Sequence, residues 1–234
     1  EDGASAVLWI DATLKAAEIP VVEAFRVLVA EPFASSAPFL DGARPEGQAA
    51  LDLRCEGALA SPVFWGRLAL SGSSLFTKHL TIRGLELDLP FEIGGRGRES
   101  SSAPEGFIHA RELIVGTASL AEINLPVRLL KGAYVLDPSR FRLHGGLLEL
   151  EDLEISPWDM KGPRARAGIR ARGLDILDIT RSYDLPSFAG RLDLDLEPLI
   201  LEGSRVESLG TVTLKAFGGE MKFADLAFEN IARP

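Results

Sequence analysis

Cysteine and histidine are scarce in this chain of 234 residues, and their scarcity excludes several kinds of site. The one cysteine, Cys55, cannot build an internal disulfide framework or a cysteine-based metal cluster, and we expect it to be a small buried residue. The three histidines, His79, His109 and His144, each lack a second ligand at metal-binding spacing, so we expect exposed or cross-strand histidines. The sequence predicts no metal site and no cofactor.

Long apolar runs and an excess of positive charge are also missing. No run of about 18 apolar residues is present, so no segment is predicted to cross a bilayer as a helix. The start, Glu1 to Gly3, has no secretory apolar region, and we expect the chain to be a soluble piece of a longer protein. The net charge of -9 argues against a nucleic-acid partner, because such binding needs clustered cations.

Sequence signatures of catalysis are absent as well. There is no Gly-x-Ser-x-Gly, no phosphate-binding loop with its lysine and no dinucleotide fingerprint. Asp193, Asp195 and Glu197 alternate with leucines, which is typical of a solvated strand face. A glycosidase would need two carboxylates that converge in a cleft, and nothing in the pattern indicates such a pair. We therefore expect no enzymatic activity, and a carbohydrate-active enzyme is a distant alternative.

What the chain does have is alternation of apolar and polar residues, in a motif that occurs twice. The stretch Phe217 to Ile231 reads FGGEMKFADLAFENI, and its core is present earlier at His144 to Ile155, HGGLLELEDLEI. Period-two alternation predicts a strand with one wet and one dry face. The Gly pair predicts a tight turn before each strand, and the alternation changes phase at Asp152.

Similar strands fill most of the chain. Ala6 to Leu14 is predicted to be a buried strand, and short strands then follow from Gly47 to the end, with a bulge at Gly84 where the alternation shifts. The residues 94–106, rich in Gly and Ser, are predicted to be a mobile loop. The fold class expected is mostly β, a long, curved and twisted antiparallel sheet that forms an open apolar groove.

Two short helices are expected to cross this sheet, over 20–31 and 175–184. The first has helical spacing of Val21, Val22 and Phe25 after Pro20, and in the second Asp175 is placed to cap the helix. Each helix precedes a strand that opens with glycine, at Gly47 and Gly190. This weak repeat divides the chain, as a single segment, into a first unit over 18–173 and a shorter second unit over 174–234.

Arginines cluster in two places, and the same two interpretations are open for both. Arg96 and Arg98 lie in the predicted loop, and 164–172 alternates arginine with small apolar residues. These cations suit a phosphate or a lipid headgroup. The favoured interpretation is that they balance the acidic strands beside them.

The amount of apolar strand face exceeds what one short helix per unit covers, so something else must cover it. A closed barrel or a second sheet would do so from within, whereas an open groove would leave the face to an acyl chain or a partner protein.

The stretch Cys55 to Leu70 reads CEGALASPVFWGRLAL, and Gly210 to Leu226 reads GTVTLKAFGGEMKFADL. Together with the Gly-Gly motif above, these segments resemble the AsmA-like superfamily, which includes TamB and YdbH, and the second segment is most similar to the YdbH branch. The resemblance implies a segment of a repeating β-groove bridge, with no catalytic residues, whose parent protein is anchored in the bacterial inner membrane, crosses the periplasm and moves phospholipid toward the outer membrane.

The resemblance also implies which residues would hold the lipid. Apolar positions on the inward face of the strands would line a groove for acyl chains: Leu80, Ile82, Leu87, Leu89, Leu192, Leu194, Leu196, Met221 and Phe223. Each of these is equally well interpreted as ordinary core between sheet and helix. The alternative function is a structural or assembly scaffold of the envelope that acts through β-edge contacts with an outer-membrane or other envelope protein.

Overall fold

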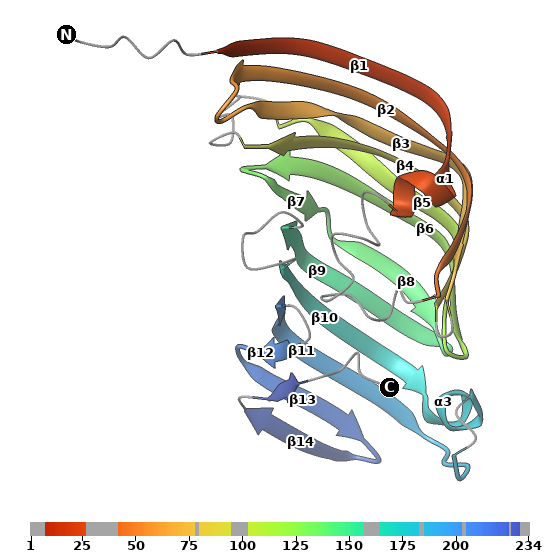
Figure 1. Cartoon of the computed structure of the whole chain (residues 1–234). Helices are drawn as coiled ribbons and strands as arrows, with labels where there is room; N and C mark the ends of the chain where they lie inside the picture. The colour runs from red at the N-terminus through yellow and green to blue at the C-terminus, as the bar shows by residue number, and fades with distance from the viewer. Residues whose placement is uncertain are drawn as a thin grey trace, which may run out of the picture.

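The structure, a computed structural model, describes residues 8–26, 42–77, 80–94, 103–156, 164–182, 185–202, 205–224 and 226–229 (Figure 1). Its strands join in one 15-stranded antiparallel sheet. The strands of the first half are β1 (Trp9–Pro20), β2 (Arg44–Ala58), β3 (Val63–Phe76), β4 (Leu80–Ile93), β5 (Glu105–Val115) and β6 (Ala118–Leu130). The mostly β, antiparallel fold expected from the alternation is confirmed.

The second half continues the same sheet with shorter strands. These are β7 (Ala133–Leu136), β8 (Ser139–Leu143), β9 (Gly146–Ser156), β10 (Arg164–Asp175), β11 (Arg191–Glu202), β12 (Arg205–Ser208), β13 (Thr211–Ala216), β14 (Gly219–Ala224) and β15 (Ala227–Glu229). Strand β11 pairs with β12 along one part and with β13 along another, and β13 pairs with β14. Among the described strands β1 has no pairing with β14 or β15, so the sheet is not closed.

Cross-strand register separates the side chains into two faces. Residues directly opposite one another point to the same side of a sheet. One row reads Ala16, Leu51, Leu68 and Leu89 across β1 to β4, while the next row along the strands reads Lys15, Asp52, Arg67 and Pro90. The alternation seen in each strand is therefore in phase with that of its neighbours.

Tight turns explain the repeated Gly-Gly motif. In both copies a two-residue loop joins the strands, His144 and Gly145 between β8 and β9, and Phe217 and Gly218 between β13 and β14. All four residues have positive φ, between 43° and 76°, which is the type I′ geometry that matches the twist of a hairpin. The second glycine of each motif begins the next strand, and a Cβ at Gly146 would meet the backbone of β10.

Two phase shifts predicted in the alternation are bulges in the structure. Asp152 has a φ of 49°, and the pairing of β9 with β10 shifts between Glu154 and Glu151. Gly84 has a φ of 60°, and neither β3 nor β5 pairs with it. Because each bulge adds one residue to the strand, the apolar residues after it must shift by one position in the sequence to stay on the same face. This is why the alternation changes phase at these sites.

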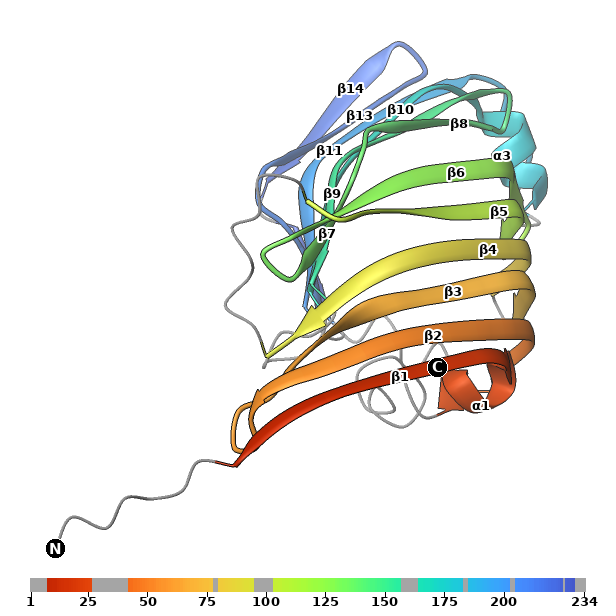
Figure 2. The same cartoon turned by 90° about the horizontal axis from the view of Figure 1, so that it is seen from above.

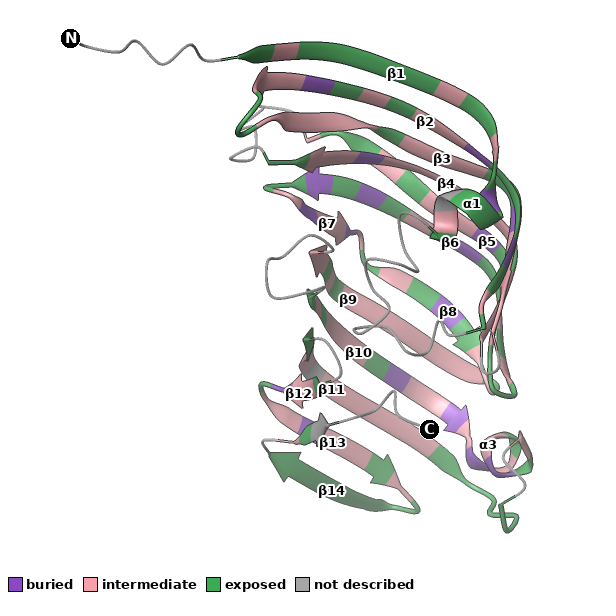
Figure 3. Cartoon of the chain, in the orientation of Figure 1, coloured by how far each residue is buried: buried purple, intermediate pink, exposed green. Residues whose placement is uncertain are grey.

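A cluster of buried hydrophobic side chains lies in the middle of the sheet. Ala110 of β5, Ile123 of β6 and Phe141 of β8 form a cluster, and leucines and an isoleucine from β4, β5, β6 and β9 pack against it. Figure 3 shows buried residues scattered along β5, β6 and β8 while β1 and β14 are mostly exposed. The core is thus one layer of side chains on one face of a sheet that curves from β1 to β14, as Figure 2 shows from above.

Several expectations for the N-terminal part need correction. The strand predicted at Ala6 to Leu14 overlaps β1, which begins at Trp9, and residues 6 and 7 lie outside the described residues. In the described sheet β1 is an edge strand, and Trp9 and Leu14 are 67% and 53% exposed. Its apolar composition suggested burial, whereas β2 is its neighbour on one side only. The helix predicted over 20–31 is α1 (Val21–Phe25), which packs on β1 and β2, and 27–31 lie outside the described residues.

The second helix agrees more closely with its prediction. It is α3 (Ile176–Ser182), and the Leu177 amide donates a hydrogen bond of 2.9 Å to Oδ1 of Asp175, which is the cap expected. Residues 183 and 184 lie outside the described residues, as do 95–102 of the predicted loop. The last residues of that loop, Glu105 and Gly106, already belong to β5.

Candidate functional site

The nine apolar positions predicted to line a groove all belong to one face of the sheet. In the first half, Leu87 lies in a row with Leu70, Ile108 and Leu125, and Ile82 lies opposite Leu113. Leu80 is two residues from Ile82 in the same strand and so points to the same face. Leu89 belongs to the row that contains Leu51 and Leu68. We call this side, with its rows of aliphatic partners, the apolar face.

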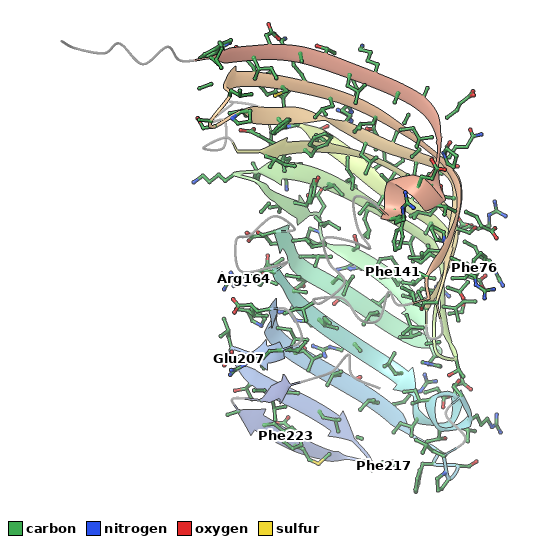
Figure 4. The ribbon with its side chains drawn as sticks, in the orientation of Figure 1. Phe76, Phe141, Arg164, Glu207, Phe217 and Phe223 are labelled. Atoms are coloured by element: carbon green, nitrogen blue, oxygen red, sulfur yellow. The ribbon has the colours of Figure 1, made fainter. Side chains whose placement is uncertain are left out.

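In the second half the same face continues to the far edge. Leu194 is opposite Leu214, which is opposite Met221, and Leu196 leads through Val212 to Phe223. Seven of the nine predicted residues are half-buried. The exceptions are Met221 and Phe223 on the edge strand β14, which are 52% and 41% exposed. Figure 4 shows Phe223 on this strand.

The opposite face, which we call the polar face, has ordered ion pairs between neighbouring strands. Asp195 accepts hydrogen bonds from Arg172 and lies 3.6 Å from Nε of Arg170, and Arg170 also bonds Glu151 at 2.7 Å. The hydrogen bond with Asp195 raises the pKa of Arg172 above its usual value, although burial acts against it. This agrees with the favoured interpretation of the arginines in 164–172, namely that they balance acidic neighbours.

The carboxylates considered for chemistry are engaged in that structural role. Oδ1 of Asp193 accepts a 2.7 Å hydrogen bond from the Gly173 amide, and Asp195 is held by two arginines. The side chain of Glu197 lies outside what is described. Among the described residues no three His, Cys, Asp or Glu side chains gather as metal ligands, and Cys55 is a free, buried thiol, as expected.

A feature that the sequence did not predict is a hollow at the end of the apolar face. Its volume is about 470 Å³, and it lies between helix α3 and the last strands. It is lined by apolar side chains and the β13–β14 turn: Ile176, Ile179, Leu192, Leu214, Ala216, Phe217, Gly219, Glu220 and Met221. We call it the terminal hollow. Leu192 and Met221 were predicted as lining residues, whereas Ile176 and Ile179 were not.

A second hollow, which we call the charged hollow, adjoins the same turn on the polar face. Its volume is about 380 Å³, and four charged residues line it together with the turn: Arg191, Asp193, Lys215 and Glu220, with Ala216, Phe217, Gly218 and Gly219. The Lys222 and Lys215 ammonium groups bond Glu220 at 2.9 and 3.2 Å and lower the pKa of its carboxyl. Nη1 of Arg191 donates to the Gly173 carbonyl at 2.7 Å.

The two hollows share the turn Ala216 to Glu220, so an apolar and a charged depression meet at one edge of the sheet. Phe217 is 68% exposed at this turn, and its ring lies edge-on to Phe188 with the centroids 6.5 Å apart. The residues that line the two hollows include no Ser, Thr, Cys or His, and the two carboxylates among them, Asp193 and Glu220, already have hydrogen-bond or ion-pair partners.

Neither of the described helices has the length and apolarity that a bilayer crossing requires. Comparison of the chain with protein-family models, with curated proteins and with solved structures finds no match, so these comparisons assign it to no family.

Proposed function

We propose that this chain is a non-enzymatic lipid carrier whose apolar face shelters the acyl chains of phospholipids. The observation that supports it best is the continuity of that face, which runs in register from Ala16 in β1 to Met221 and Phe223 in β14. The two described helices make their main contacts with β1, β2 and β10, and no other described helix lies over the strands between them.

The curvature of the sheet favours a groove on this side. Ala110, Ile123 and Phe141 are 3 to 8% exposed although they sit on a single layer of strands. Side chains on a concave face crowd together in this way, while those on the convex face spread apart. We therefore include in the proposal that the apolar face forms an open groove and that the two short helices cross it.

The energy available is large enough to hold a lipid. Each buried methylene contributes about 0.8 kcal/mol, so an acyl chain with even ten sheltered carbons gains roughly 8 kcal/mol before the costs of ordering it. The rows of aliphatic side chains run across the strands from one to the next, so an extended chain contacts them along its length.

The cellular setting that we propose is the one implied by the resemblance to AsmA-like proteins. The chain would be a periplasmic segment of a bridge protein that is anchored in the inner membrane and delivers phospholipid toward the outer membrane. An outer-membrane or other envelope protein would be its partner. Shielding of acyl chains requires no catalysis, so the proposal assigns the chain no catalytic residues.

Native mass spectrometry with organic extraction tests this function on the chain purified from a bacterial periplasm. We expect phospholipid to copurify, and to be lost in Leu87→Asp and Leu194→Asp because each places a carboxylate among apolar partners. The matched control is Ile200→Asp, on the same strand as Leu194 but on the polar face opposite Arg166. Circular dichroism confirms that each variant remains folded.

A second candidate is a structural scaffold that acts through its sheet edges. The observation that favours it is that, within the described residues, β1 and β14 each pair with a strand on one side, and both expose apolar side chains. If the purified chain is a stable, lipid-free monomer that also fails to take up a fluorescent phospholipid, lipid carriage is rejected and the scaffold function becomes the favoured one.

A further inference from the structure

We propose that the β13–β14 turn is a phospholipid headgroup site, with the phosphodiester in the charged hollow and an acyl chain in the terminal hollow. This inference rests on the proposed lipid carriage and adds a place and a chemistry to it. The two hollows share the turn Ala216 to Glu220, which lies at the edge of the sheet, so one amphiphile can pass from the apolar to the polar face around it.

The terminal hollow suits an acyl chain. Ile176 and Ile179 of α3 face Leu192 and Leu214 of the sheet across a volume of about 470 Å³, which is within the usual range of small-molecule sites. It is continuous with the rest of the apolar face, because Leu192 is opposite Leu174 and Ala216. A chain seated here therefore extends into the row that Leu194 and Met221 share.

The charged hollow suits a phosphodiester because its carboxylates already have partners while its cations have donors to spare. Glu220 is bonded by two lysines, and Asp193 accepts from the Gly173 amide. Arg191 has five N–H donors, and the structure shows one hydrogen bond from it, to the Gly173 carbonyl. Asp193 lies opposite Lys215, so Arg191 and Lys215 are diagonal neighbours on one face. Backbone positions in this relation are roughly 7 Å apart. A phosphate between Arg191 and Lys215 reaches both.

The identity of the turn residue Phe217 also favours a lipid site. Type I′ turns favour Asn, Asp or Gly at their first central position, yet Phe217 occupies it with a φ of 53° and is 68% exposed. A bulky side chain in this conformation is strained, and such strain concentrates at binding sites. An aromatic ring between an apolar and a charged surface is also the usual arrangement at a lipid interface.

The test compares two lipids that carry the same fluorescent acyl chain, phosphatidylcholine and diacylglycerol, which lacks the phosphate. Arg191→Ala/Lys215→Ala is expected to weaken phosphatidylcholine binding about tenfold and to leave diacylglycerol binding unchanged. The matched control, Lys15→Ala/Arg140→Ala, removes two exposed cations of the polar face elsewhere and should change neither. Ile179→Asn, in the terminal hollow, should weaken both lipids.

The outcomes separate this proposal from lipid carriage itself. If the wild type binds both lipids and the Arg191/Lys215 variant still binds phosphatidylcholine as tightly, lipid carriage stands and the headgroup site is rejected. If the wild type binds neither lipid, both are rejected. Soluble glycerophosphocholine provides the last arm: should it compete as strongly as the intact lipid, the site binds a free headgroup with no acyl contribution, and the proposal is overturned.

Discussion

Tyr134 places a phenol on the apolar face, opposite Leu129 of β6 and Ile155 of β9. Burial raises the pKa of its hydroxyl to about 12, because the charged phenolate is disfavoured away from water. In the unfolded chain the phenol loses its proton near pH 10. The contribution of Tyr134 to the free energy of unfolding is therefore fully present below pH 10 and is lost as pH rises toward 12.

We therefore expect the free energy of unfolding to fall more steeply above pH 10 in the wild type than in Tyr134→Phe. Urea unfolding of both proteins, followed by tryptophan fluorescence from pH 8 to 11.5, measures the difference, and the other titrating groups cancel in the comparison. Parallel stability profiles over that range would show that the Tyr134 phenol is not buried as described.

Strands β2 and β3 approach each other closely at Gly66. Gly66 lies opposite Leu53, and a Cβ at this position would overlap the Asp52 carbonyl oxygen. Gly168 of β10 is a matched control, since a Cβ there would meet Glu151 at 3.4 Å, an ordinary contact. Neither glycine has a positive φ, so the two differ in space and not in backbone conformation.

Gly66→Ala is expected to destabilise the protein by about 2 kcal/mol or more, because the clash is with backbone and two strands must separate to relieve it. Gly168→Ala should be neutral or slightly stabilising, since alanine restricts the unfolded chain. Urea denaturation midpoints of the two variants give the comparison. Equal midpoints would mean that β2 and β3 are not in the register described.

The elements also show what local sequence predicts well. The bulges at Gly84 and Asp152 and the cap at Asp175 were predictable, because each depends on residues within one segment. The exposure of β1 was not, because burial depends on which strands lie beside it. The terminal hollow was missed for the same reason: Ile176, Leu192 and Met221 meet only after α3, β11 and β14 have assembled.

For the whole molecule, the chain-order pairing of β1 to β7 follows from the succession of strands and turns, since antiparallel neighbours close the smallest loops. Whether such a sheet closes depends on its first and last strands finding each other, which alternation does not encode. The apolar face was predictable in its residues, such as Leu87 and Leu194, because register keeps the alternation of neighbouring strands in phase. The continuity of that face across β1 to β14 needed the structure.

An open sheet with its core in the middle should lose structure from its edges. Among the described strands β14 pairs with β13 alone, and all six of its residues are exposed, whereas β5 and β6 have neighbours on both sides and contribute Ala110 and Ile123 to the buried cluster. Hydrogen exchange followed by mass spectrometry should therefore show the amides of 219–224 exchanging first and those of β5 and β6 last. The measurement is made on the monomer at two protein concentrations, because self-association through β14 would protect that edge. If 219–224 are protected as strongly as β6 at both concentrations, the edge is not open, and the central cluster is not what holds the sheet together.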